Sequence, residues 1–300
     1  MSLLVVGSLA LDSVETPTAV RDNQLGGSAV YFSYAASYFS EVSLVGVVGE
    51  DWPVANTELL QSRKIDTAGL QTISGGQTFR WRGKYMENMN DRETLEVHLN
   101  VLGEFNPIVP DNYKASRFVF LANAAPAVQL KTLEQVESPQ LVVADTMDLW
   151  IRETKDDLLA LLKRVDGLVL NDSEAKLLTH EENVVKAAEK VLEMGPKFVV
   201  IKKGEHGALL YSNEGAFALP AYPTGDVVDP TGAGDSFAGG MMGFLAHRNQ
   251  ADDQTLRLAL VYGTIVASFN VEDFSLERMK QISREDIDHR LALYRQMLAF

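Results

Sequence analysis

The segment Asp229-Pro-Thr-Gly-Ala-Gly-Asp-Ser-Phe-Ala-Gly-Gly240 joins a polar, glycine-rich turn to a run of apolar and small residues that continues to Ala246. Pro230 and Thr231 suit a turn or the first residues of a helix, and the run after Asp235 has helical length and spacing. The segment therefore predicts a turn at a helix N-terminus, where several backbone N–H groups have no partner within the helix.

The residue types in this turn suit the binding of a phosphate. Gly232 and Gly234 have no side chains to cover the free N–H groups, and Ala233 adds only a methyl group. Free N–H groups and the positive end of the helix dipole attract anions. Asp235 adds a carboxylate that can accept a hydroxyl proton, so the turn combines the two requirements of phosphoryl transfer to an alcohol. An isolated G-x-G-D would be explained more simply by tight packing and by the preference of Asp for a helix N-terminus.

The full string from 229 to 240 resembles the C-terminal signature of the ribokinase-like (PfkB) family of carbohydrate and nucleoside kinases. The resemblance implies that residues 232–234 stabilise the phosphoryl group in transit, that Asp235 deprotonates the acceptor hydroxyl, and that the cofactors are ATP and Mg²⁺. Thr231 is assigned by its position to the nucleotide site. Family members often hold a monovalent cation beside the anion hole. Asp229, which matches part of that site together with Thr231, is the candidate ligand for K⁺.

The composition excludes several other classes of protein. Of the 300 residues, 46% are hydrophobic and 23% charged, which is typical of a globular protein with a large core. No stretch reaches the roughly 18 apolar residues of a membrane span, and we expect a buried helix over 258–269. The formal charge of −14 opposes nucleic acids and anionic membranes as partners. The chain has no cysteine and its N-terminus does not resemble a signal peptide, so we expect a cytoplasmic protein.

The predicted acceptor site lies in the N-terminal part of the chain. Asp12 follows the first buried strand, at the edge where open α/β sheets bind ligands, although it could be a turn residue. Gly26 and Gly27 precede a helix predicted over 28–39 and allow a ligand to approach the backbone. In the family, an Asp at the first position binds substrate hydroxyls and an Asn beyond the glycines contacts the sugar. This chain has Tyr31 at the latter position, where the ring either stacks on the substrate or belongs to the core.

Residues 70–102 differ from the rest of the chain. Polar and apolar residues alternate over 78–86 and 93–100, which predicts a hairpin with one solvent-exposed face. Family members carry a small β-sheet lid here, often used to pair subunits, so we expect a lid formed with residues 12–25 and a homodimer through it. Arg80 is assigned to the substrate site, with a solvated lid arginine as the equal alternative.

The remaining segments alternate between strands and helices, which predicts a parallel sheet covered on both faces. The predicted strands are 118–121, 141–145, 167–170 and 197–201, and the predicted helices are about 127–137, 149–165 and 181–194. We therefore expect a single domain over 1–300. Its fold is predicted to be a three-layer α/β/α ribokinase-like fold with a mostly parallel sheet and a β lid.

The second half of the chain also carries the predicted nucleotide site. Asn171 and Glu174 form an N-x-x-E phrase at a strand end, which resembles a family motif that organises Mg²⁺ and the phosphates. Asp172 or Ser173 would explain the start of a helix here by capping alone, but Mg²⁺ takes few protein ligands, so one Asn/Glu pair suffices. Lys202 and Gly204 match a K-x-G phrase that lines the nucleotide site in the family. Asn270 is assigned to the same site from its position in the chain.

These features predict a kinase that transfers the γ-phosphate of ATP to the hydroxymethyl group of a small sugar or a ribonucleoside. The alternative is a catalytically silent sugar- or nucleotide-binding protein on the same fold, but such a protein is expected to lose Asp235 or a turn glycine, and neither is lost. A hydroxymethylpyrimidine kinase is disfavoured by the developed lid. A dinucleotide-dependent oxidoreductase and a P-loop NTPase are excluded because their glycine-rich motifs are absent.

Overall fold

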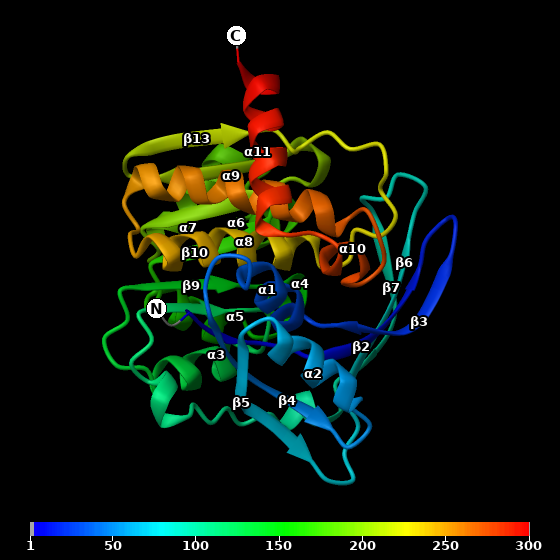
Figure 1. Ribbon diagram of the computed structural model, residues 1–300. Coiled ribbons are helices and arrows are strands. Elements are labelled where there is room, and N and C mark those ends of the chain that lie inside the picture. The colour runs from blue at the N-terminus through cyan, green and yellow to red at the C-terminus, as the bar shows by residue number, and fades with distance from the viewer. Residues whose placement is uncertain (1–2, 300) are drawn as a thin grey trace.

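A large mixed sheet runs through the middle of the protein (Figure 1). The computed structural model describes residues 3–299, and the sheet has nine strands within that range. In spatial order they are β13 (Gly215–Leu219), β12 (Ala208–Ser212), β11 (Phe198–Lys202), β10 (Gly167–Asn171), β9 (Leu141–Asp145), β8 (Phe118–Leu121), β1 (Leu3–Val6), β4 (Val42–Gly49) and β5 (Ile65–Ile73). The strands from β11 to β5 are parallel, and β12 and β13 add an antiparallel edge.

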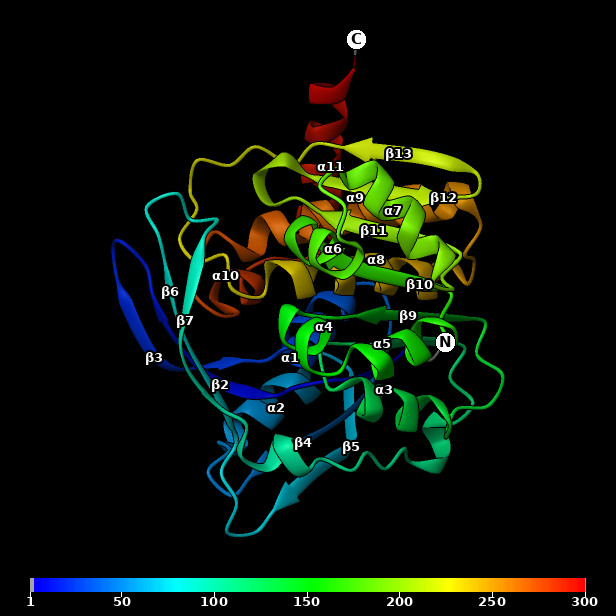
Figure 2. The same cartoon turned by 180° about the vertical axis from the view of Figure 1, so that it is seen from behind.

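Helices cover both faces of this sheet (Figures 1 and 2). One face is covered by α1 (Ser28–Ala36), α8 (Ala233–Arg248) and α9 (Asp253–Asn270), with α11 (Arg284–Leu298) packed on α9. The other face is covered by α3 (Pro126–Leu133), α4 (Asp148–Glu153), α5 (Lys155–Leu162), α6 (Asp172–Thr179) and α7 (Val184–Glu193). Two further helices are α2 (Val54–Ser62) and α10 (Glu277–Lys280). The predicted three-layer fold is therefore confirmed.

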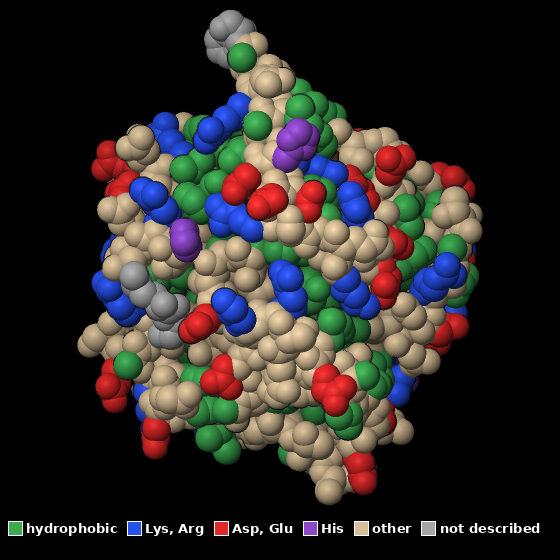
Figure 3. Space-filling view, in the orientation of Figure 1, with side chains coloured by type: hydrophobic (Ala, Val, Ile, Leu, Met, Phe, Trp, Pro, Cys, Tyr) green, Lys and Arg blue, Asp and Glu red, His purple; other side chains and the backbone are tan. Residues whose placement is uncertain are grey.

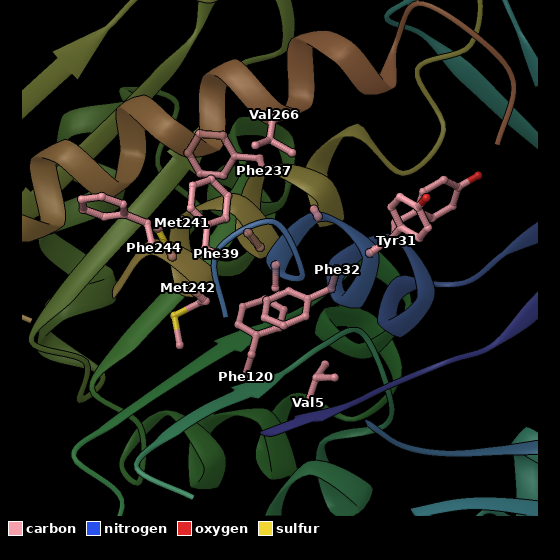
Figure 4. Close-up of a cluster of buried hydrophobic side chains, with 14 of the residues drawn as sticks. Val5, Tyr31, Phe32, Phe39, Phe120, Phe237, Met241, Met242, Phe244 and Val266 are labelled. Atoms are coloured by element: carbon pink, nitrogen blue, oxygen red, sulfur yellow. The ribbon is translucent and has the colours of Figure 1, made fainter. Parts of the chain in front are cut away.

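The strands read as continuous apolar runs because both of their faces are buried. Leu3 and Val5 of β1 point into the core beneath α1 and α8, whereas Leu4 and Val6 point into the core on the opposite face. Figure 4 shows the first of these cores, in which Phe32 of α1 stacks on Phe120 of β8 with ring centroids 4.3 Å apart.

Small residues let α8 pack closely against its neighbours. A side chain at Gly239 would overlap the backbone of Phe32 in α1, and one at Gly240 would lie 3.1 Å from the Cα of Gly263 in α9. The small-residue run that follows the glycine-rich turn thus has a packing role. It holds the N-terminus of α8 at a fixed position between α1 and α9.

A second, four-stranded sheet projects from the large sheet, at the right of Figure 1. Its strands are, in spatial order, β3 (Val20–Gly26), β2 (Ala10–Glu15), β6 (Phe79–Tyr85) and β7 (Arg92–His98). We call this sheet the lid. Its boundaries differ from the predicted 12–25 and 70–102, because β2 begins at Ala10 and β5 pairs with β4 in the large sheet until Ile73.

Two other details differ from the prediction. The helix expected over 149–165 is divided into α4 and α5 at Thr154, and the hairpin of β12 and β13 was not predicted. The predicted domain range, 1–300, includes residues 1, 2 and 300, which lie outside the described residues. No helix within residues 3–299 is long and apolar enough to span a membrane. On the face shown in Figure 3, Lys and Arg side chains are interspersed with Asp and Glu.

Candidate active site

The glycine-rich turn is the N-terminus of α8, as predicted from the sequence. Gly232 precedes the helix with a φ of 76°, in the left-handed region, and a side chain there would overlap the ring of Tyr31. The Ala233 N–H bonds to the Pro230 carbonyl within the turn at 3.1 Å. For Gly234, no acceptor of its N–H group is found within residues 3–299. The turn therefore has a free donor at the positive end of a sixteen-residue helix.

Asn270 supports this turn from below. Its Nδ2 donates a hydrogen bond to the Thr231 carbonyl and its Oδ1 accepts one from the Ser236 hydroxyl, both at 2.8 Å. Asn270 is fully buried. Both ends of its amide are used to hold the turn, and its predicted contact with the nucleotide stays a prediction.

Asp235 lies in the first turn of α8 and is partly exposed, so a ligand can reach it. Desolvation by the surrounding protein raises the pKa of its carboxyl group, and the negative charge of Asp145 raises the pKa further. The positive charges of Lys202 and Arg92 oppose this shift. A carboxylate with a raised pKa is a stronger base, which suits the acceptance of a hydroxyl proton near neutral pH.

Asp12 lies in β2 beside the glycine pair, and only 5% of its surface is exposed. Its carboxylate lies against Gly26, where a side chain would overlap it. Burial raises the pKa of Asp12 to about 7, although the Gly27 N–H bonds to the carboxylate and lowers it. Among the described residues, Asp12 Oδ1 has no hydrogen-bond partner. A buried polar atom without a partner is rare and suggests a ligand that would satisfy it.

The substitution Asp12→Asn is expected to stabilise the ligand-free protein at pH 8. Because the folded-state pKa of Asp12 is about 7 and the model value is 3.8, its contribution to stability is complete below pH 4 and is lost as the pH rises to 7. The uncharged amide avoids this loss, which is at most on the order of 4 kcal/mol. Thermal unfolding of both proteins from pH 4.5 to 8.5 tests the expectation. Parallel stability curves would contradict it, and Asp226→Asn, on an exposed loop, is the control.

Tyr31 packs against the glycine-rich turn and lies near Asp12. Its ring packs on Gly232, and only 2% of its surface is exposed. Its pKa is raised by burial and by the nearby charges of Asp12, Asp229 and Asp235. Of the two roles left open for Tyr31, the structure therefore favours packing over stacking on a ligand. Asp229 itself is buried and accepts a hydrogen bond from the Thr231 N–H at 2.9 Å, which stabilises the start of the turn.

Lys202 reaches the other side of the turn from the end of β11. Its Nζ is 2.9 Å from the position that a Cβ of Gly234 would occupy, and 3.8 Å from Asp145 Oδ2. Although burial alone would lower the pKa of Lys202, the carboxylates of Asp145 and Glu174 raise it. The ammonium group therefore stays charged beside the free N–H group of Gly234.

Asn171 and Glu174 form a capping box at the start of α6. The Asn171 side chain accepts from the Glu174 N–H, and Glu174 Oε2 accepts from the Asn171 N–H, both at 2.8 Å. Burial raises the pKa of Glu174 to about 7. No group of three or more His, Cys, Asp or Glu residues that could enclose a metal is found within residues 3–299. This donor set fits Mg²⁺, which takes few protein ligands and binds mainly phosphate and water.

A cavity of about 490 Å³ extends from Lys202 and Gly234 along the N-terminal half of α8. Gly204 lines it, as do Ala233, Phe237 and residues 221–224 of the loop before the turn. Residues 88–90, at the tip of the β6–β7 hairpin, form part of its wall. Asn90 Nδ2 donates to Glu205 Oε1 at 2.9 Å, so the tip of the lid lies across this cavity.

The two faces of the lid differ in their chemistry. Asp12 pairs with Trp81, and Tyr85 pairs with Arg92, so these four residues share the face toward the turn, which we call the inner face. Arg80 lies on the opposite, outer face. There it forms an ion pair with Asp51 at 2.7 Å. The contact predicted between Arg80 and the substrate stays a prediction, and the arginine on the inner face is Arg92.

Comparison with known proteins agrees with this arrangement. Residues 16–279 match the pfkB family of carbohydrate kinases. A cytidine kinase of Thermococcus kodakarensis is 30% identical, over 87% of this chain and 94% of its own length. A nucleoside kinase of Methanothermobacter thermautotrophicus is 28% identical, over 90% of this chain and 89% of its own length.

Solved structures show the same fold. The nucleoside kinase of Methanocaldococcus jannaschii superposes with a TM-score of 0.77 at 20% identity, over 97% of this chain and 98% of that one. A putative ribokinase II from E. coli, solved with ATP and Mg²⁺, gives the same TM-score and the same identity. The match covers 97% of this chain and 99% of that one. The chain therefore belongs to the pfkB carbohydrate kinase family and is an ATP-dependent kinase that phosphorylates hydroxyl groups.

Proposed function

We propose that this kinase transfers the γ-phosphate of ATP to the hydroxymethyl group of a ribonucleoside. The observation that carries the proposal is the position of Asp12 and Asp235. The charge of Asp235 raises the pKa of Asp12, so the two carboxylates lie near each other, and Asp235 belongs to the helix that the glycine-rich turn begins. An acceptor held by Asp12 would place a hydroxyl group next to Asp235.

In this arrangement Asp235 is the general base that accepts the hydroxyl proton. The free Gly234 N–H and the Lys202 ammonium, which lie side by side, stabilise the phosphoryl group in transit. Mg²⁺, when bound beside Glu174, neutralises part of the charge of the phosphates. The cavity that runs from Lys202 to the 221–224 loop holds the rest of the nucleotide.

The choice of a nucleoside rests on the relatives. The two relatives reported above that share most of this chain are named as cytidine and nucleoside kinases. The unpartnered Oδ1 of Asp12, with the rest of its carboxylate, can accept hydrogen bonds from two neighbouring ribose hydroxyls. A small furanose sugar presents the same hydroxyls and is the alternative acceptor.

An acceptor panel tests this proposal. With Mg-ATP, we expect ADP release that depends on a ribonucleoside, with kcat/KM in the usual range of about 10⁴–10⁸ M⁻¹s⁻¹ for the true acceptor. Cytidine, uridine, adenosine, guanosine and inosine are compared with ribose and fructose, and product mass identifies the phosphorylated species. Turnover with the free sugars alone would show that the acceptor is a sugar and not a nucleoside. Loss of turnover when the 5′-hydroxyl is replaced by hydrogen would confirm the hydroxymethyl group as acceptor.

A further inference from the structure

Arg92 is the first residue of β7 and lies on the inner face of the lid. It is exposed in the described structure, so its guanidinium group is accessible to a ligand. The guanidinium carbon is 5.6 Å from the centre of the Trp81 ring, a cation–π contact that supports the side chain from the lid side. The side chain is therefore held by the lid and directed into the site.

The strand that carries Arg92 is tied to the glycine-rich turn. Tyr85, directly opposite Arg92 in the register, has its hydroxyl 3.2 Å from the Thr231 Oγ1. The Arg92 guanidinium is also close to the Tyr85 hydroxyl. Tyr85, Val14 and Phe274 form a small buried cluster, against which Met89 and Val228 pack. These contacts place Arg92 at the boundary between the lid and the turn.

The electrostatic interactions of Arg92 agree with this position. Burial raises the pKa of Asp12, of Glu174 and of Asp235, and the positive charge of Arg92 opposes each of these shifts. It also lowers the pKa of Lys202, so the two cations repel each other. Lys202 lies at Gly234, whereas Arg92 lies on the inner face of the lid, which it shares with Asp12. An anion between them would remove this repulsion.

The basic residues of the outer face differ from Arg92. Three of them have a carboxylate partner there: Arg80 with Asp51 at 2.7 Å, Arg82 with Asp22 at 3.3 Å, and Lys84 with Glu15 at 2.5 Å. In the part of the chain that the structure describes, Arg92 has no ion pair of this kind. Apart from the donor that faces the Tyr85 hydroxyl, its guanidinium donors are available to a ligand, and a phosphoryl group matches their geometry.

We propose that Arg92 is a catalytic residue supplied by the lid, which donates hydrogen bonds to the phosphoryl group as it passes from ATP to the acceptor. This inference rests on the proposed function. The acceptor oxygen forms a bond to the γ-phosphorus while the bond from that phosphorus to the β–γ bridging oxygen breaks. The hydroxyl proton moves to Asp235, and ADP leaves with the electron pair of the broken bond. Arg92 and Lys202 hold the equatorial oxygens from opposite sides.

Three variants test the proposal. Arg92→Met removes the charge but keeps a long side chain against Trp81, and we expect kcat to fall by about 10²- to 10³-fold. Affinity for ATP, measured by calorimetry without acceptor, is expected to fall about tenfold or more, whereas affinity for ADP stays unchanged because ADP lacks the γ-phosphate. Arg92→Lys keeps the charge but lacks the planar guanidinium group, so its kcat should lie between those of the wild type and Arg92→Met. Arg82→Met, on the outer face, is the matched control and should behave as the wild type.

Equal kcat values for Arg92→Met and Arg82→Met would overturn the proposal, and so would equal losses of affinity for ATP and ADP. If Arg92→Met does not fold, Arg92→Lys provides the same comparison against the control. The proposed function can fail separately: the wild type would then release no ADP with any acceptor. In that case the difference between ATP and ADP affinities still decides whether Arg92 contacts the γ-phosphate.

Discussion

Asp235→Asn is expected to lower kcat by about 10²- to 10⁴-fold, while affinity for ATP stays close to that of the wild type. The amide has nearly the same shape as the carboxylate but cannot accept a proton, so the hydroxyl group would attack without a general base. The wild-type kcat should rise as the pH passes through the raised pKa of Asp235, because only the ionised carboxylate is a base. That rise should be absent in the variant. Steady-state ADP release from pH 5 to 9, with calorimetry for ATP, gives both quantities.

The control for this experiment is Asp226→Asn, which changes an exposed carboxylate of the loop that precedes the same turn. It removes the same formal charge without touching the site, so its kcat should equal that of the wild type. A variant Asp235→Asn with wild-type kcat would show that another group, or solvent, accepts the proton. The role assigned to the turn would then lose its chemical basis.

Gly232→Ala is expected to lower both stability and activity. An L-residue at a φ of 76° costs about 1–2 kcal/mol, and the new methyl group would overlap the Tyr31 ring, which adds about 1–3 kcal/mol. Relief of that overlap must move the turn or the ring, and the N–H donors of the turn would then be misplaced. We expect kcat to fall by about 10²- to 10³-fold even well below the unfolding temperature. Urea unfolding and ADP release measure the two effects separately.

Gly225→Ala is the matched control, because Gly225 lies in the same loop with open space around its Cα. Its stability should change by no more than about 0.5 kcal/mol, which is usual for a surface substitution. If Gly232→Ala also retained wild-type stability and kcat, the close packing of Tyr31 on the turn would have no functional meaning.

Much of the fold could be predicted because buried parallel strands are continuous apolar runs. The predicted strands at 118–121 and 141–145 have the same bounds as β8 and β9. The hairpin of β12 and β13 was missed because its strands depend on pairing, of β12 with β11 and of β13 with β12, rather than on a pattern of their own. The helix expected over 149–165 was too long because apolar spacing continues across Thr154, where the backbone leaves the helical region.

The candidate site was predictable where one contiguous string forms it, and not where distant segments meet. The turn and Asp235 come from a single motif, and the structure brings Asp12, Lys202 and Glu174 to the same turn. Arg92, to which we assign a role above, was not predicted because the face of a lid strand depends on its register, and β7 contains a bulge that sequence alternation does not reveal. Asn270 was assigned to the nucleotide from its position in the chain, which did not reveal that its amide holds the turn. The K⁺ site at Asp229 and Thr231 and the homodimer through the lid stay predictions.

The β6–β7 hairpin contacts both the glycine-rich turn and the nucleotide cavity. The same hairpin carries Arg92 and Tyr85 at the turn and residues 88–90 at the nucleotide cavity. The hairpin is one continuous piece of sheet, so it cannot open over the nucleotide without also lifting from the acceptor side. Under the proposed function, release of ADP and release of the phosphorylated acceptor depend on a single movement, and at saturating substrate the frequency of that movement sets an upper limit on turnover.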